Sequence, residues 1–190
     1  MEELALHLLD LAQNSLAAGA SDLSIWVRED KKNDCLTIGL ADNGCGMEPE
    51  FVQRVTDPFT TTRTTRRVGL GLPLLAMNAR LCDGDLKIES EPGKGTRIEA
   101  TFRLNHWDRP PLGNIPATLV TILAGAPECN LSYSHSVDGR EFSFSAGEVR
   151  KELGEIPLTN PKVLIFLQDY LQEALTNLYG GAIDGDKKPG

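Results

Sequence analysis

Residues 3–18 carry apolar and polar positions at helical spacing, arranged in two stripes. The apolar stripe consists of Leu4, Leu8 and Leu11 and continues to Ser15. The second stripe is polar and consists of His7, Asp10 and Asn14. A helix packed on a sheet explains the apolar stripe, whereas the polar stripe needs a separate explanation.

Alternation of apolar and polar residues then predicts four strands. Two of them cover residues 23–27 and 36–42, and the second delivers Asp42 at its end. The other two form a hairpin around a turn at residues 91–95. Two further helices are expected, one after Pro49 and one over residues 71–81. Helices on one face of a mixed sheet give the expected fold class, α+β, as a two-layer α/β sandwich.

The second half of the chain predicts another hairpin over residues 130–146, because Asp138-Gly139 suits a two-residue type I′ turn. In that register one face is apolar and the other is rich in serine. The apolar face consists of Leu131, Tyr133, His135, Phe142, Phe144 and Ala146. Ser145 is expected to cap a short helix, and Asn160 a longer one that ends at Gly180-Gly181.

These elements suggest two domains separated by a linker. Residues 105–116 carry three prolines and read as that linker. The first domain is expected over residues 1–104. A small α+β domain with one helix, the hairpin and two helices is expected over residues 117–181, and a loose tail over residues 182–190.

Composition narrows the class of protein. The chain has 190 residues, of which 41% are hydrophobic and 24% charged, so it is long enough for one large or two small domains. A net charge of -8 disfavours nucleic acid as a partner. The four cysteines form no C-x-x-C pair, which argues against a zinc site or a disulfide framework. Without an apolar run of bilayer length or a signal-peptide pattern, the expected location is the cytoplasm, away from membranes.

Four short blocks along the first half have the chemistry of a nucleoside triphosphate site. They are residues 10–14, 42–47, 57–59 and 69–72. A carboxylate such as Asp42 only accepts hydrogen bonds, so it can take the exocyclic amine of adenine but not the carbonyl of guanine. Asn14 offers an amide oxygen, a hard ligand that suits Mg²⁺. Gly69 and Gly71 precede a helix whose N-terminus can face phosphates.

In their order and residue types, the blocks resemble the ATP-binding domain shared by histidine kinases, DNA gyrase B, mismatch-repair MutL proteins and related ATPases, the GHKL superfamily. Residues 10–21 resemble the MutL form of the first block, and residues 57–63 and 90–96 the histidine-kinase form. The resemblance covers residues 1–104 and implies a Bergerat-type fold that binds ATP with Mg²⁺. The residues it places around the nucleotide are Asn14, Asp42, Gly44, Gly46, Met47, Phe59, Thr61, Thr62, Arg63, Gly69, Leu70, Gly71, Leu72 and Thr96.

The resemblance also gives individual roles. Asn14 would hold Mg²⁺ through ATP, Thr96 would reach adenine through water, and Arg63 stands where related kinases often carry a phosphate-contacting lysine. Asp10 stands where the ATP-hydrolysing branch carries a glutamate that polarises the attacking water, so it is a candidate general base, a weak base or only a neighbour of the metal. Arg67 replaces the first glycine of the usual block and alters the expected lid.

His7 lies on the same stripe as Asp10 and either tunes it or is a surface or lid-packing residue.

Two classes of function follow from ATP binding. The chain is either an enzyme, an ATPase or a protein kinase that acts on a partner in trans, or a non-catalytic module that senses ATP. In both cases residues 105–181 are expected to engage a partner protein. Nothing in the sequence defines the oligomeric state.

Overall fold

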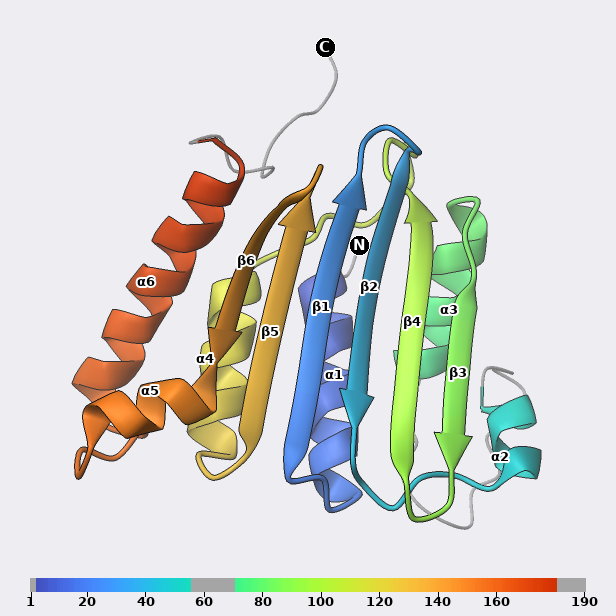
Figure 1. Ribbon diagram of the computed structural model, residues 1–190. Coiled ribbons are helices and arrows are strands. Elements are labelled where there is room, and N and C mark those ends of the chain that lie inside the picture. Colours follow the sequence, from blue (N-terminus) through green and yellow to red (C-terminus); the bar gives the residue numbers. More distant parts are fainter. Residues whose placement is uncertain (1–2, 56–70, 181–190) are drawn as a thin grey trace.

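The computed structural model describes residues 3–55 and 71–180. Along the chain, helices alternate with pairs of strands, and the strands form one six-stranded sheet (Figure 1). The elements are α1 (Leu4–Ala17), β1 (Asp22–Asp30), β2 (Cys35–Asp42), α2 (Pro49–Arg54), α3 (Gly71–Leu81), β3 (Leu86–Glu91), β4 (Gly95–Arg103), α4 (Ile115–Gly125), β5 (Asn130–Val137), β6 (Arg140–Ser145), α5 (Ala146–Leu153) and α6 (Pro161–Leu178). The order of the strands in the sheet is β3-β4-β2-β1-β5-β6. The predicted α+β class is confirmed.

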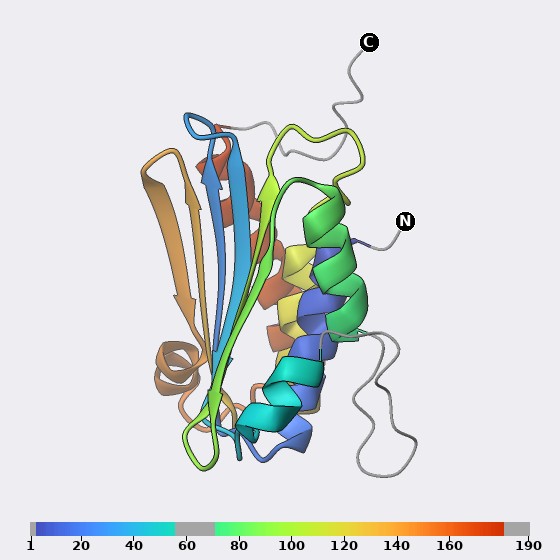
Figure 2. The ribbon, with the colours of Figure 1, turned by 90° about the vertical axis from the view of Figure 1, so that its right-hand side faces the viewer.

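The sheet forms one layer, and the helices that cover one of its faces form the second. Helices α1, α3 and α4 lie on one face of the sheet, as the view along its edge shows (Figure 2). The strand faces turned toward them carry the alternating apolar residues that predicted the strands, and these residues are buried. Because the alternation has a period of two, one face of each strand enters the core and the other faces away from the helices.

The segment after residue 116 contains the expected helix, hairpin and two helices. Asp138 and Gly139 have φ angles of 48° and 84°, as a type I′ turn requires. Ser145 accepts a hydrogen bond from the backbone amide of Glu148, and Asn160 accepts one from that of Lys162. Both predicted helix starts are therefore confirmed.

The arrangement of that segment differs from two domains joined by a linker. Strand β5 pairs in parallel with β1, from Asp22 opposite Asn130 to Glu29 opposite Val137. Its apolar residues belong to the same core as those of β1 and β2. Helix α4 supplies the crossover that a parallel pair needs, so residues 117–180 extend the first sheet and share its core.

A polar cluster lies within this shared part of the core. His135 is fully buried on β5, and its Nε2 lies 3.1 Å from Oε1 of Glu29 on β1. Its Nδ1 lies 2.8 Å from the hydroxyl of Tyr133. The hydroxyl of Tyr179, at the end of α6, donates to Glu29. These contacts satisfy the buried polar groups and fasten the end of α6 to β1 and β5.

Tyr133 is expected to make the stability of the fold decrease at alkaline pH. Burial, and to a lesser degree the charge of Glu29, raises the pKa of the Tyr133 phenol well above its usual value. The folded chain therefore keeps a proton that the unfolded chain releases near pH ~10. We expect the free energy of unfolding to fall above that pH by at most about 1.4 kcal/mol per pH unit from this residue.

Urea denaturation at pH 8 and above pH ~10 tests this expectation. Tyr133→Phe lowers stability at both pH values because His135 loses a partner, but it should reduce the loss between them. An equal loss in the variant and the original protein would contradict the assignment to Tyr133.

Candidate functional site

The Asp42 carboxylate at the end of β2 is held by donors from three elements. Its Oδ2 accepts from the hydroxyl of Ser15 on α1 at 2.5 Å. Its Oδ1 accepts from the backbone amides of Gly44 at 2.8 Å and of Thr96 on β4 at 3.3 Å. A carboxylate has about four acceptor positions, so these three bonds leave capacity for one more donor, such as an adenine amine.

The sequence pattern puts Ser15 at the end of the apolar stripe of α1, so it predicts a core position and gives Ser15 no part in the site. The side chain is 5% exposed, and a buried hydroxyl needs a hydrogen-bond partner. A serine at the end of a leucine stripe was the available signal. Its partner, however, is 27 residues away and follows only from the packing of α1 against β2.

Glycine residues bring the loop after β2 into direct backbone contact with the β3–β4 turn. At Gly46, with a φ of 68°, a side chain would collide with the carbonyl oxygen of Glu91. At Gly95, with a φ of 100°, it would collide with the carbonyl of Asp42. Gly44 is buried against Ala18 of the turn after α1. Positive φ and close backbone approach both require glycine here, and the loop after β2 is thereby held against the β3–β4 turn.

Ser90 ties this loop to the start of β4. Its hydroxyl accepts from the backbone amide of Met47 at 2.8 Å and lies 2.8 Å from the hydroxyl of Thr96. Thr96 itself pairs with Asp42 across the two strands. Met47 and Thr96 are thus brought together with Asp42. Ser90, the first residue of the 90–96 motif, is not among the residues expected to contact the nucleotide.

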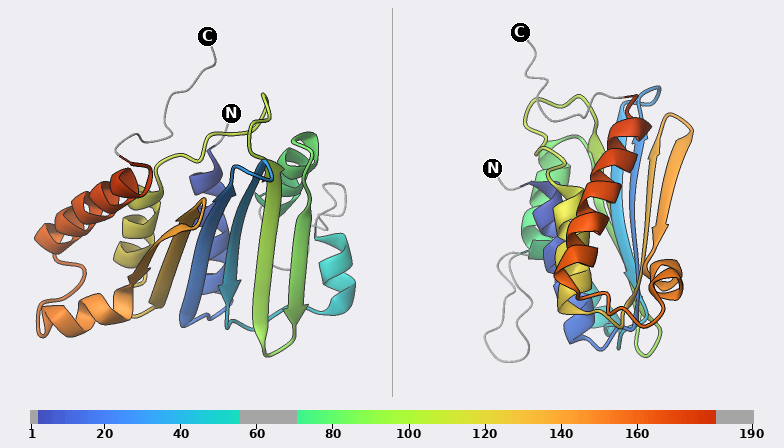
Figure 3. Two further views of the ribbon diagram at one scale, coloured as in Figure 1. Left: turned by 45° about the horizontal axis from the view of Figure 1, so that its top comes forward. Right: turned by 90° about the vertical axis from the view of Figure 1, so that its left-hand side faces the viewer.

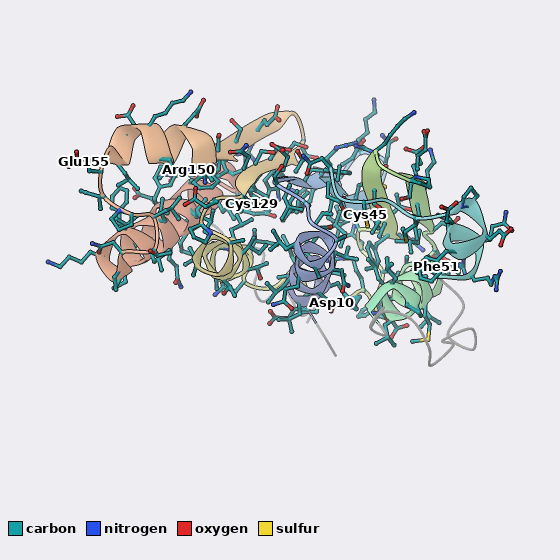
Figure 4. The ribbon with its side chains drawn as sticks, turned by 90° about the horizontal axis from the view of Figure 1, so that it is seen from below. Asp10, Cys45, Phe51, Cys129, Arg150 and Glu155 are labelled. Carbon is teal, nitrogen blue, oxygen red and sulfur yellow. The ribbon has the colours of Figure 1, made fainter. Side chains whose placement is uncertain are left out.

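The polar stripe of α1 meets the start of α3. The Nδ2 of Asn14 donates to Oδ2 of Asp10 at 3.3 Å. The Asp10 carboxylate lies against the α carbon of Gly71, so closely that any side chain at position 71 would collide with it. In the view from below, α3 is seen between α1, which carries Asp10, and α2, which carries Phe51 (Figure 4). Asp10, Asn14 and the N-terminus of α3 therefore form one group, next to Ser15 and the Asp42 carboxylate.

His7 lies one helical turn before Asp10 and is 4% exposed. Its Nε2 lies 3.4 Å from Nδ2 of Asn78 on α3. Because Gly71 begins α3, this contact joins α1 to α3 two turns beyond the place where Asp10 meets Gly71. His7 is a buried interhelical residue, which excludes the surface position.

The remaining predicted contacts divide into two groups. Leu72 is described, and its side chain is 6% exposed within the core, which leaves its backbone for any contact with phosphate. The others lie outside the described residues: Phe59, Thr61, Thr62, Arg63, Gly69 and Leu70.

The family model for the histidine kinase-, DNA gyrase B- and HSP90-like ATPases matches residues 2–106, more than half of the chain. The chain belongs to this ATPase family. The match supports ATP binding and covers all of the residues gathered around Asp42, Asn14 and Gly71.

Histidine kinases are among its relatives. Sensor protein kinase FleS of Pseudomonas aeruginosa is 38% identical over 88 residues, which are 46% of this chain and 22% of that protein. The signal transduction histidine-protein kinase AtoS of Escherichia coli is 31% identical over 105 residues, which are 55% of this chain and 16% of that protein. The matched part thus spans between 16% and 22% of these curated relatives.

A solved structure titled as the N-terminal domain of a DNA repair protein has a similar fold. It gives a TM-score of 0.51 at 16% identity, over 76% of this chain and 53% of that one. The covered share exceeds residues 2–106. The likeness in fold therefore continues into the part of the chain that the family model does not match.

Within residues 3–55 and 71–180, no helix is long and apolar enough to cross a membrane.

Proposed function

We propose that this protein binds Mg²⁺-ATP and transfers the γ-phosphoryl group to water or to a residue of a partner protein. The observation that carries the proposal is the Asp42 carboxylate, which three protein donors orient and which keeps capacity for one more. It lies beside a glycine-containing loop that packs on the backbone of the β3–β4 turn, and membership of the ATPase family supports ATP as the nucleotide.

The other residues fit the phosphate end of the same ligand. Asn14 uses its Nδ2 on Asp10, which leaves its amide oxygen for a cation. Mg²⁺ commonly takes one or two protein oxygens together with substrate phosphates, and when bound it neutralises charge on the transferred group. The amides at the N-terminus of α3 favour anions. Asp10 accepts from Asn14 and lies against Gly71, and in this proposal it takes a proton from the nucleophile.

Asn14→Ala tests the proposed metal position. The change should remove most of the gain in ATP affinity that Mg²⁺ provides, while adenosine binding stays within about twofold, because the base contacts lie at Asp42. Gln13→Ala, an exposed neighbour on α1, is the matched control. Calorimetric titrations with and without Mg²⁺ measure both terms, and an unchanged Mg²⁺ effect in folded Asn14→Ala would rule out this role.

A second candidate function is ATP sensing without turnover. Its support is that the Asp10 carboxylate already accepts from Asn14 and packs against Gly71. A carboxylate so engaged can serve to hold α1 against α3. In that case ATP would change how residues 105–181 engage a partner protein, through the difference in affinity between two states.

Incubation with γ-labelled ATP and Mg²⁺, alone and with cell extract, separates these functions. Free phosphate from the purified protein indicates an ATPase, and a labelled protein that depends on Asp42 indicates a kinase. Nucleotide binding without either product favours the sensor. Absence of ATP binding would refute the proposal as a whole.

A further inference from the structure

Helix α6 presents large apolar side chains on the side turned away from the core. Its inner side consists of the buried residues Leu167, Leu171, Leu175 and Leu178. On the outer side Ile165, Phe166 and Tyr170 are 63%, 66% and 44% exposed. We call these three residues the outer face of α6. Such a face on one helix is unlike single exposed apolar residues, which are common on any protein.

The outer face is ordered by its own contacts and continues onto β6. The rings of Phe166 and Tyr170 stack with centroids 6.4 Å apart. Tyr170 also lies 6.1 Å from the ring of Phe142 on β6, the last strand of the sheet. Aromatic side chains held in this way lose little freedom on binding and are enriched at protein interfaces.

Opposite charges flank this face at one helical turn on either side. Lys162 precedes Ile165 and Phe166 by three to four residues, and Asp169 follows them by the same spacing, so all four lie on one side of the helix. Both charged side chains are exposed, and neither forms an ion pair with another described residue.

We infer that the outer face of α6 binds a second copy of this chain, with the two α6 helices antiparallel. A two-fold axis between positions 165 and 166 places position 162 of one copy opposite position 169 of the other, since both are equally far from the centre. Lys162 of each copy then lies opposite Asp169 of the other, so the dimer contains two such pairs. A cation before and an anion after an apolar centre is thus self-complementary, as an isologous interface requires.

The position of α6 allows this approach. Seen from the edge of the sheet, α6 runs in front of the other described elements along its length (Figure 3). It packs on α4, β5 and β6 with its inner side. The second copy would therefore cover the outer side without displacing any described contact.

Sedimentation velocity over 1–100 µM, roughly the range in which modest interfaces associate, tests the assignment. The protein should form dimers, and Phe166→Glu should raise the dissociation constant at least about a hundredfold, because each copy loses an apolar contact at the centre. Trp107→Glu is the control, since Trp107 is 82% exposed but lies outside α6. It should leave the dimer intact.

Charge reversal tests the pairing itself. Lys162→Glu and Asp169→Lys should each weaken dimerisation about tenfold, because each places like charges together at two positions. The double variant restores both pairs in the opposite sense and should return the dissociation constant to within about threefold of the original. Circular dichroism checks that α6 remains folded.

Two results would overturn the inference. A protein that stays monomeric at all these concentrations leaves the outer face to a different partner. A dimer that Phe166→Glu does not weaken, or in which the double reversal is no tighter than the single changes, uses another surface. Neither result bears on ATP binding, because the proposed nucleotide site lies near β2 and β4, whereas α6 packs at the β6 edge of the sheet.

Discussion

Replacing Asp42 with asparagine is expected to weaken ATP binding at least a hundredfold. Asparagine puts an NH₂ group in place of one carboxylate oxygen, so a donor would face the adenine amine, and sites that lose such a match discriminate strongly. At a ligand concentration of a hundred times the dissociation constant, ATP stabilises by about 2.7 kcal/mol. This corresponds to a rise of roughly 5–10 °C in melting temperature for a chain of this size. In Asp42→Asn the rise should fall to about 1 °C.

The fold should tolerate this change. The amide oxygen can still accept from Gly44 and Thr96, and the Ser15 hydroxyl can rotate to accept from the new NH₂ group. The melting temperature without nucleotide should therefore stay within about 3 °C. Asp85→Asn, an exposed aspartate just before β3, is the matched control. Equal thermal shifts with ATP and GTP in the original protein would refute adenine selection by Asp42.

Replacing Asp10 with asparagine distinguishes a base from a structural group. If Asp10 accepts the proton of the attacking nucleophile, Asp10→Asn should lower kcat by about a hundredfold or more and keep ATP affinity within about threefold. Asparagine has the same shape, so contact with Gly71 is preserved. Single-turnover measurements with saturating ATP give the chemical step directly.

A structural role predicts a different pattern. If the Asp10 carboxylate serves only to hold Asn14 and the start of α3, the change should lower the melting temperature and leave kcat per folded molecule unaltered. Asp108→Asn, an exposed aspartate between β4 and α4, controls for loss of a charge. A normal kcat in Asp10→Asn would exclude the base role whatever happens to stability.

Local pattern was sufficient to predict the strands and the position of Asp42. Alternation of apolar residues set the face of each strand, and the turn at Asp138-Gly139 fixed the register of the last hairpin. The two stripes of α1 predicted that one side would enter the core and the other would carry Asp10 and Asn14. These features depend on neighbours within a few positions, which a sequence displays directly.

Contacts between distant segments could not be predicted in the same way. Alternation shows that β5 is a strand but does not show which strand it pairs with. The three prolines in residues 105–116 suggest a domain boundary, whereas the chain there leads into α4 and on to β5, which pairs with β1. Ser15 and Ser90 contribute hydroxyls whose partners are set by helix and strand packing. Serine is a common residue, so its presence in a sequence does not mark a site. Its hydrogen-bond partner does, and that partner is set by tertiary packing.

The parallel pairing of β1 with β5 has a consequence for how the protein is made. Asp22 and Asn130 are 108 positions apart and are linked by a side-chain hydrogen bond at the edge of this pair. During synthesis the first strand leaves the ribosome long before the strand that completes its hydrogen bonding. Until residue 137 has emerged, one side of β1 offers unpaired amides and carbonyls to solvent or to other chains. The sheet of the nucleotide-binding part is therefore completed only after β5, residues 130–137, has been synthesised.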